Sequence, residues 1–223
     1  MESSSTPATS TPLVSSEPMD QYQKDHQLRF QLSAEWLAPI MSPVTQVLEL
    51  GGTGIFKCPG SPQVTGSVGD LRYTHPAPSL YDVVLCMEVL EHINDRDAIG
   101  ADIPTEWRGD GVSHMLHTAW HSLKKGGHLF LTTPNASSIT CIYHALNLRP
   151  GVLYRPHVRE YSVYEVDELV RDQGFEIVRR ETHDVWRNAI NAGEHDAIRE
   201  FIQTQGYPDT LRGEDIFLLA RKP

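Results

Sequence analysis

The stretch Val47-Leu48-Glu49-Leu50-Gly51-Gly52-Thr53-Gly54 places a short apolar run directly before three glycines. An uninterrupted run such as Gln46–Leu50 is typical of a strand that is covered on both faces in a parallel sheet. Ligands of open parallel sheets bind beyond the carboxyl ends of the strands, and glycines there let the backbone approach them closely. We therefore expect a ligand site over these glycines, although similar turns also serve nucleotides or simply make tight bends.

Further short apolar runs alternate with helical patterns along the chain. We expect strands at residues 46–50, 81–87, 128–133, 175–179 and 215–220. We expect helices at residues 21–40, 89–97, 111–123 and 163–173, with a polar helical insertion in 187–207. This alternation predicts one doubly wound, mostly parallel α/β sheet in a single domain over residues 20–223.

The first 19 residues consist mainly of Ser, Thr and Pro. They contain almost nothing to bury, so we expect a disordered tail, and they lack the pattern of a signal or transit peptide.

Cys58, Cys86 and Cys141 show neither zinc-site nor disulfide spacing, which favours a reducing compartment. No apolar run is long enough to suggest a membrane span. We expect a cytoplasmic protein that does not bind membranes.

The charge balance argues against a nucleic-acid partner. The net charge is -10 at pH 7, whereas nucleic-acid affinity comes largely from Lys and Arg. The basic pairs Lys124-Lys125 and Arg179-Arg180 are more typical of a solvated surface than of a binding patch. We expect a small-molecule substrate, and the sequence leaves the oligomeric state open.

Three later segments resemble class I S-adenosylmethionine (SAM)-dependent methyltransferases. Residues 81–92, YDVVLCMEVLEH, end in the E-V-L-E-H pattern of one branch of that family. Residues 123–135, LKKGGHLFLTTPN, resemble its L-K-P-G-G … T-P-N segment. Residues 157–162, HVREYS, followed by Gly174-Phe175, resemble its later H-x-R-E-[FY] … G-F region. Together with the glycine turn these segments occur in the family's order, which makes the resemblance more specific than any one of them.

The resemblance implies a Rossmann-like fold and a SAM site. In the family, the methionine end of SAM is faced by the positions that match Glu49, Gly51, Gly52 and Gly54. The position near the adenine matches Asp70, and the positions that line the methyl-transfer site match Met87 and Glu88.

The region after the first strand departs from the family's pattern. Only 15 residues separate Gly54 from Asp70, and none of them is Asp or Glu. The family normally fits a helix and at least one strand there, and an acid ending the second strand binds the ribose. Either residues 64–66 form a minimal second strand and Asp70 binds the ribose or adenine, or the cofactor site is impaired. We favour the first alternative, because the two later strand segments keep their full polar pattern.

The E-V-L-E-H segment also carries candidates for acid-base chemistry and for metal binding. If it opens a helix, Glu88 shares a face with Glu91 or His92, and His157 can approach from a later loop. Glu88, His92 and His157 are candidate catalytic groups, with an imidazole as general base. In some relatives such a group holds a divalent metal, so Glu88, Glu91, His92 and His157 are candidate ligands. The alternative, which we favour, is that Glu91 pairs locally and His92 packs against the sheet.

The sequence therefore predicts methyl transfer from SAM to a hydroxyl of a sugar, a phenol or another secondary metabolite. The alternative is a catalytically silent, methyltransferase-like binding or regulatory protein, which the short interval before Asp70 would explain. A nucleotide-sugar or NAD-linked enzyme is disfavoured, because G-x-G-x-x-G is absent and no acid lies about 20 residues after the glycines.

Overall fold

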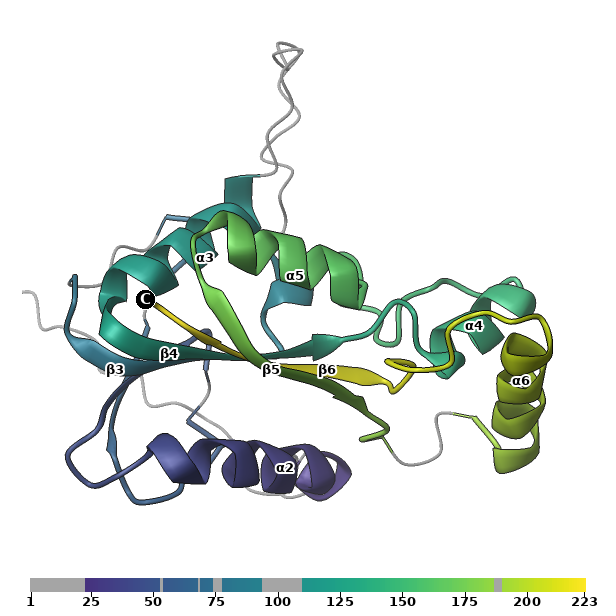
Figure 1. Ribbon diagram of the computed structural model, residues 1–223, viewed down its shortest axis with the longest axis horizontal. Coiled ribbons are helices and arrows are strands. Elements are labelled where there is room, and N and C mark those ends of the chain that lie inside the picture. Colours follow the sequence, from purple (N-terminus) through teal and green to yellow (C-terminus); the bar gives the residue numbers. More distant parts are fainter. Residues whose placement is uncertain (1–22, 53, 68, 74–77, 94–109, 187–189) are drawn as a thin grey trace, which may run out of the picture.

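The computed structural model contains one six-stranded sheet in the order β2-β1-β3-β4-β6-β5 (Figure 1). The first four strands run parallel, and β6 is antiparallel to both of its neighbours. This confirms the predicted, mostly parallel α/β sheet. The strands are β1 Gln46–Leu50, β2 Gln63–Gly66, β3 Tyr81–Met87, β4 Leu123–Pro134, β5 Glu176–His183 and β6 Asp215–Arg221.

The structure describes residues 23–52, 54–67, 69–73, 78–93, 110–186 and 190–223. The N-terminal tail expected at residues 1–19 lies outside these ranges.

Helices cover both faces of the sheet (Figure 1). Helices α3 (Asp110–Ser122) and α5 (Val163–Asp172) lie on one face, and α2 (Gln27–Leu37) with the 3-10 helix η1 (Ala38–Ile40) lies on the other. Side chains alternate along each strand, so β4 sends Leu129 and Leu131 towards α3 and α5 and Phe130 towards Trp36 of α2. The central strands β1, β3, β4 and β6 are therefore largely buried on both faces, as their apolar runs predict, whereas the edge strands β2 and β5 are largely exposed or half-buried.

The predicted ends of α5 are confirmed by local interactions. Ser162 and Glu165 form a reciprocal capping box at its start, which satisfies two backbone N–H groups. Gly174, just past its end, has φ +92, a conformation that glycine adopts without strain.

The helix expected at residues 89–97 is wrong for the described part of that range. Only the 3-10 helix η2 (Leu90–His92) forms there, beginning two residues after Glu88, which has φ +55. The Glu91 carbonyl accepts a hydrogen bond from the backbone N–H of Val158 at 2.7 Å, from far along the chain. A tertiary contact thus replaces the hydrogen bond that an α-helix would need. Residues 94–97 lie outside the described ranges.

The connection from β1 to β2 contains no helix among its described residues. β2 is nevertheless paired with β1, with Val64 opposite Val47, which confirms the minimal second strand. Phe56 of this connection packs beside Phe30 of α2, with ring centroids 5.8 Å apart. The N-terminal helix and the connection therefore cover this end of the sheet together.

A small lobe extends beyond the carboxyl end of β4 (Figure 1). It consists of α4 (Ile139–Leu146) and α6 (Ala192–Thr204), which pack through Ile139, Ile198 and Ile202. Helix α6 lies in the expected insertion, whereas α4 was not expected from the sequence. The lobe stands over the end of the sheet where a ligand site is predicted.

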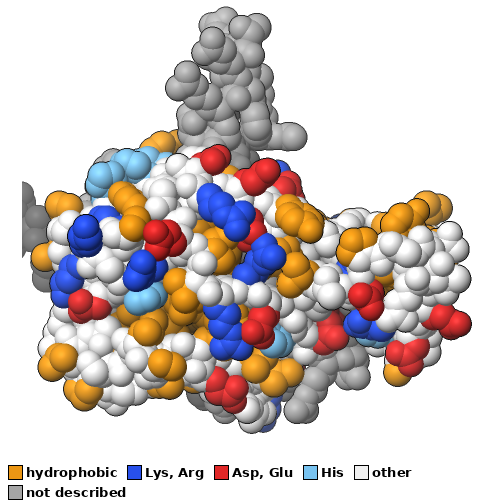
Figure 2. Space-filling model, viewed as in Figure 1, with side chains coloured by type: hydrophobic (Ala, Val, Ile, Leu, Met, Phe, Trp, Pro, Cys, Tyr) orange, Lys and Arg blue, Asp and Glu red, His pale blue; other side chains and the backbone are white. Residues whose placement is uncertain are grey.

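Positive and negative side chains are interspersed on the face that carries α5 and β5 (Figure 2). Arg179 pairs with Glu181 at 2.7 Å, and Arg180 pairs with Asp167. Lys124 likewise pairs with Asp82 at 2.7 Å. Both basic pairs in the sequence are thus at least partly neutralised by acids.

Within the described residues, no helix combines the length and the apolar character needed to cross a membrane.

Candidate functional site

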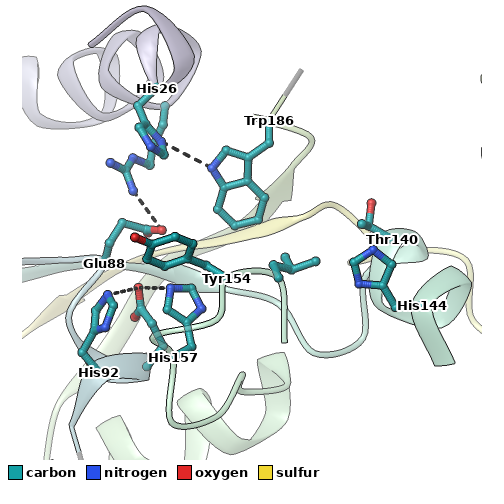
Figure 3. A pocket seen from close by; sticks show the side chains of 11 residues that line it. His26, Glu88, His92, Thr140, His144, Tyr154, His157 and Trp186 are labelled. Carbon is teal, nitrogen blue, oxygen red and sulfur yellow. Dashed lines mark hydrogen bonds and ion pairs between the residues drawn. The ribbon is translucent and has the colours of Figure 1, made fainter. Parts of the chain in front are cut away.

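Two cavities lie side by side at the carboxyl end of the parallel strands, and they share Glu88 and His92 as walls. The first, of about 520 Å³, lies over the glycine turn and is called the turn cavity below. It is lined by Gly51, Gly69, Asp70, Leu71, Arg72, Glu88, Val89, His92 and Ile93. The second, of about 490 Å³, lies between α2 and the lobe and is called the lobe cavity (Figure 3). It is lined by His26, Arg29, Glu88, Glu91, His92, Thr140, His144, Leu153, Tyr154, His157 and Trp186.

The glycine turn is shaped around the buried side chain of Glu49. A Cβ at Gly52 would lie 1.9 Å from the carboxyl carbon of Glu49, so only glycine leaves room for it. Burial raises the pKa of Glu49, while the backbone N–H of Gly54 and the charge of Lys57 oppose that rise. Glu49 therefore supports the turn from below and does not line the turn cavity.

Asp70 lies just beyond the end of β2, at the rim of the turn cavity. Its carboxylate accepts hydrogen bonds from Nε of Arg72 at 3.0 and 3.1 Å and from Nη2 at 2.6 Å. These hydrogen bonds hold the pKa of Asp70 below its usual value. Leu71, Val89 and Ile93 add apolar surface to the lining of this cavity. A carboxylate that can accept ribose hydroxyls, beside an apolar wall, fits an adenosyl group.

The predicted cofactor residues fall into two groups. Gly51, Asp70 and Glu88 line the turn cavity. The others do not line it: Glu49 and Gly52 form the base of the turn, Gly54 follows with φ +69, and Met87 packs against the core under α2.

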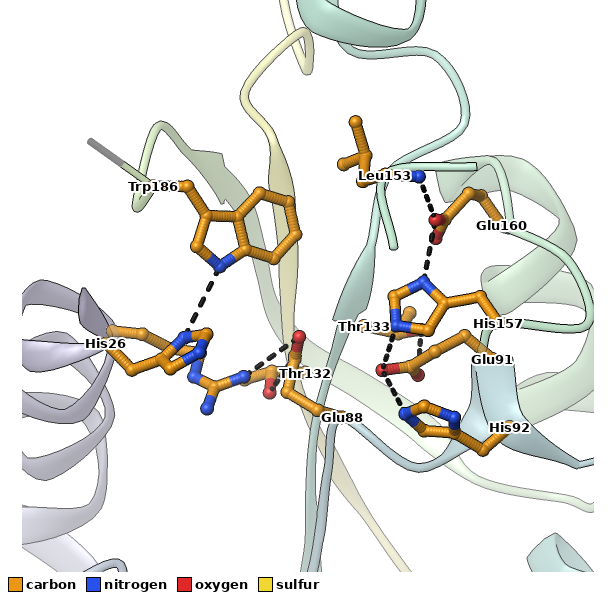
Figure 4. A network of polar contacts seen from close by, with 11 residues as sticks. His26, Glu88, Glu91, His92, Thr132, Thr133, Leu153, His157, Glu160 and Trp186 are labelled. Atoms are coloured by element: carbon orange, nitrogen blue, oxygen red, sulfur yellow. Dashed lines mark hydrogen bonds and ion pairs between the residues drawn. The ribbon is translucent and has the colours of Figure 1, made fainter. Parts of the chain in front are cut away.

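Glu88 is held in place by three interactions (Figure 4). Its backbone N–H donates to the Thr132 carbonyl at 2.9 Å, and its Oε1 accepts from the Thr132 hydroxyl at 2.8 Å. Its Oε2 lies 2.8 Å from Nη1 of Arg29. The carboxylate shared by the two cavities therefore has a fixed orientation, set by β4 and α2.

His157 and Glu160 form a buried pair on the other side of the site (Figure 4). His157 Nδ1 lies 2.8 Å from Glu160 Oε1, and the side chains are 7% and 1% exposed. The backbone N–H of Leu153 donates to the same Glu160 oxygen at 2.7 Å. Glu160 thus fixes the imidazole ring with Nε2 on the side of Glu91. The sequence pattern alone gives Glu160 no role, although it lies three residues after His157 in the segment HVREYS.

Glu91 is fully buried between the two histidines. Its Oε2 accepts from the Thr133 hydroxyl at 2.8 Å, while Oε1 has no hydrogen-bond partner among the described residues. Oε1 lies 4.0 Å from Nε2 of His92 and 4.0 Å from Nε2 of His157. Burial raises the pKa of Glu91 to about 7. Burial, and then the charge of His157, lower the pKa of His92.

The structure brings together three of the four candidate metal ligands. One ligand atom from each of Glu91, His92 and His157 lies within 4.8 Å of the others. Glu88 is turned towards Arg29 instead, because the α-helix that would have aligned it with Glu91 does not form.

Residues distant in sequence close the lobe cavity (Figure 3). Nδ1 of His26 accepts a hydrogen bond from the indole N–H of Trp186 at 3.4 Å. Burial, assisted by Arg29, lowers the pKa of His26 to about 4, so this imidazole is neutral and able to accept. Thr140 and His144 contribute one face of α4 to the opposite wall. The sequence gives one signal for Arg29, which lies seven residues before Trp36 on the buried face of α2.

A family model described as a methyltransferase domain matches residues 15–180. This range includes the first four strands and the two residues, Glu88 and His92, that line both cavities. The chain belongs to this family. No curated protein matches the sequence. The match ends before α6 and β6, so half of the lobe of this methyltransferase lies outside the family's common part.

Solved methyltransferase structures share the fold. A SAM-dependent methyltransferase from Archaeoglobus fulgidus is 15% identical, with a TM-score of 0.54 over 91% of this chain and 99% of the other. A possible histamine N-methyltransferase from Thermotoga maritima is 17% identical, with a TM-score of 0.55 over 93% and 95%. Phosphoethanolamine N-methyltransferase 2 from Haemonchus contortus is 13% identical, with a TM-score of 0.51 over 93% and 57%.

The cofactor of this methyltransferase domain is SAM, as predicted from its sequence. The Haemonchus structure contains S-adenosylhomocysteine (SAH), the demethylated form of SAM, together with phosphomonomethylethanolamine. At these identities the neighbours establish the fold and not the acceptor.

Proposed function

We propose that this methyltransferase binds SAM in the turn cavity and methylates a hydroxyl of a small acceptor in the lobe cavity. The observation that carries the proposal is the shared wall of Glu88 and His92, through which the two cavities adjoin. A donor and an acceptor in adjoining cavities can be held in the orientation that transfer requires. A turn cavity of about 520 Å³ also argues against a catalytically silent protein with a collapsed cleft.

Within the turn cavity, Asp70 is the group that we assign to the ribose or adenine. It follows β2, the strand paired with β1. In the family, an acid at the end of the second strand binds the ribose, and Asp70 is the first acid after β2 in this chain. The glycine turn, supported by Glu49, brings the backbone of Gly51 to the cavity, and Glu88 closes the end next to the acceptor. Bound SAM supplies an electrophilic methyl group on a sulfonium sulfur.

We assign the general base to His157. Its Nδ1 is held by Glu160, an arrangement that leaves Nε2 to accept the proton of an acceptor hydroxyl in the lobe cavity. The buried Glu160 carboxylate stabilises the imidazolium that forms and keeps its N–H directed inward. His92 is more exposed and has no carboxylate at hydrogen-bond distance among the described residues, so it is the weaker candidate for the base.

The walls of the lobe cavity favour a flat acceptor with a hydroxyl at one end. The indole of Trp186, the ring of Tyr154 and Leu153 offer aromatic and apolar surface. Glu88, His92 and His157 form a polar cluster on one side of the cavity, apart from Thr140 and His144 (Figure 3). Among the hydroxyl acceptors, a phenol fits this division better than a sugar does.

A divalent cation on Glu91, His92 and His157 is a second candidate feature, because a carboxylate with two imidazoles suits Mn²⁺ or Zn²⁺. Calorimetry with Mn²⁺, Mg²⁺ and Zn²⁺, and activity before and after chelation, tests it. Unchanged activity after chelation, with no heat of metal binding, leaves His157 as the base without a metal.

The proposal is tested by calorimetry with SAM, followed by transfer of a labelled methyl group to phenols, sugars and amines. We expect saturable heat with SAM and label on a phenolic oxygen. Two outcomes would contradict the proposal. The absence of heat at millimolar SAM removes the cofactor assignment, and label on amines alone removes the hydroxyl assignment.

A further inference from the structure

Arg29 is a cation that the N-terminal helix carries into the methyl-transfer site. The residue is only 2% exposed, and it lies on the buried face of α2 together with Ser33 and Trp36. A guanidinium removed from water in this way requires an anionic partner, because desolvation of an unpaired charge is very unfavourable. Its Nη1 lies 2.8 Å from Oε2 of Glu88, which borders both cavities.

A second acid near Arg29 does not take over this role. Asp215, the first residue of β6, is fully buried, and neither of its oxygens has a hydrogen-bond partner among the described residues. Burial and three neighbouring glutamates raise the pKa of Asp215 well above its usual range, against the opposing effect of Arg29. Burial therefore disfavours the charged form of Asp215, whereas the Glu88 carboxylate lies at ion-pair distance from the guanidinium.

We propose that Arg29 is a positioning residue for methyl transfer, which neutralises Glu88 and holds its carboxylate against α2 and β4. The inference rests on the proposed function, because it requires SAM in the turn cavity. It assigns to the N-terminal helix a direct part in the electrostatics of the site, beyond covering the sheet.

The physical reason lies in the loss of charge during the reaction. The sulfonium of SAM is positive, whereas the thioether of SAH is neutral, so the positive charge on sulfur declines towards the transition state. An unneutralised carboxylate at Glu88 would attract the reactant more than the transition state and would slow the transfer. With Arg29 paired to it, the shared wall carries little net charge.

The ratio of SAM affinity to SAH affinity, measured by calorimetry, reports this charge without depending on an acceptor. Arg29→Met leaves Glu88 unneutralised, and we expect the ratio to rise about fivefold. Glu88→Gln removes the carboxylate charge and keeps the guanidinium, and we expect the ratio to fall about fivefold. The double variant Arg29→Met/Glu88→Gln removes both charges and should return the ratio to within about twofold of wild type.

The matched control is Gln31→Ala on the exposed side of the same helix, where Gln31 bonds only to Glu35 among the contacts described. It should leave the ratio unchanged. If Arg29→Met changes SAM and SAH binding equally, or not at all, Arg29 only anchors α2 and the inference is overturned. If thermal melting shows that Arg29→Met does not fold, Glu88→Gln decides, and a ratio that does not fall overturns the inference. Wild-type protein that binds neither ligand contradicts the proposed function instead.

Discussion

Thr132 and Thr133 are neighbours on β4, and each donates its hydroxyl, at 2.8 Å, to a different glutamate of the loop that follows β3. Successive residues of a strand point to opposite faces, so Thr132 holds Glu88 on the side of α2 and Thr133 holds Glu91 on the side of α5. This divides the site into two polar groups. Arg29 completes the first, and the pair of His157 and Glu160 completes the second.

Replacing Glu160 tests the second group. Glu160→Gln keeps an acceptor for Nδ1 of His157 but removes the negative charge that stabilises the imidazolium. We expect kcat to fall about 10- to 100-fold with the affinity for SAM unchanged, because Glu160 does not line the turn cavity. The measurement combines steady-state kinetics with calorimetry. Glu176→Gln, which alters an exposed pair with Arg221, serves as the control. Equal losses in kcat and in SAM affinity would show that Glu160 only supports the fold.

Glu91 makes stability depend on pH. Burial raises its pKa to about 7 in the folded protein, from 4.5 in the unfolded chain. Between these values the folded state binds the additional proton, so Glu91 favours folding at low pH and this contribution is lost as the pH rises towards 7.

We therefore expect Glu91→Gln to stabilise the protein relative to wild type by about 3 kcal/mol more at pH 7.5 than at pH 4.5. Urea unfolding at the two pH values measures this difference. His26, whose pKa is lowered, changes the slope in the opposite direction in both proteins and cancels in the comparison. A difference of zero would mean that the fold does not raise the pKa of Glu91 above its value in the unfolded chain.

Much of the fold is encoded in local patterns. The continuous apolar runs predict β1 and β3 to the residue, since strands covered on both faces need apolar side chains throughout. The helix predicted at residues 163–173 likewise matches α5, which the capping box of Ser162 and the turn at Gly174 bound. His92 and His157 emerge as candidates from motifs 65 residues apart, and the structure places their rings 4.7 Å from each other.

The remaining features depend on tertiary contacts that no local pattern contains. The turn at Glu88 is fixed by Thr132 and by the distant N–H of Val158, which together override the helical pattern that follows it. Arg29 meets Glu88 across 59 residues of sequence, and only its place on the buried face of α2 distinguishes it from a surface arginine. Helix α4 has too few residues for a clear periodic signal.

The glycine turn makes a steric prediction. Gly52→Ala places a Cβ 1.9 Å from the Glu49 carboxyl carbon and must displace that side chain, so we expect SAM affinity to fall about tenfold or more. Gly66→Ala is the matched control, since a Cβ there meets no atom within 4 Å. Adding Glu49→Ala to Gly52→Ala removes the clash and should restore part of the affinity. Calorimetry on the three variants decides, and equal affinities of Gly52→Ala and wild type would place the cofactor elsewhere.

Asp70 and Arg72 give opposite predictions for the same ligand. If Asp70 accepts hydrogen bonds from the ribose, Asp70→Asn lowers SAM affinity about tenfold, the usual effect of losing hydrogen bonds to a charged group. Arg72 donates to both oxygens of that carboxylate, so Arg72→Met removes these competing hydrogen bonds and should raise the affinity about two- to fivefold. Asp82→Asn, at the far end of the sheet, is the control. A loss of affinity in Arg72→Met would show instead that the guanidinium contacts the cofactor, and unchanged affinity in Asp70→Asn would remove Asp70 from the ribose site.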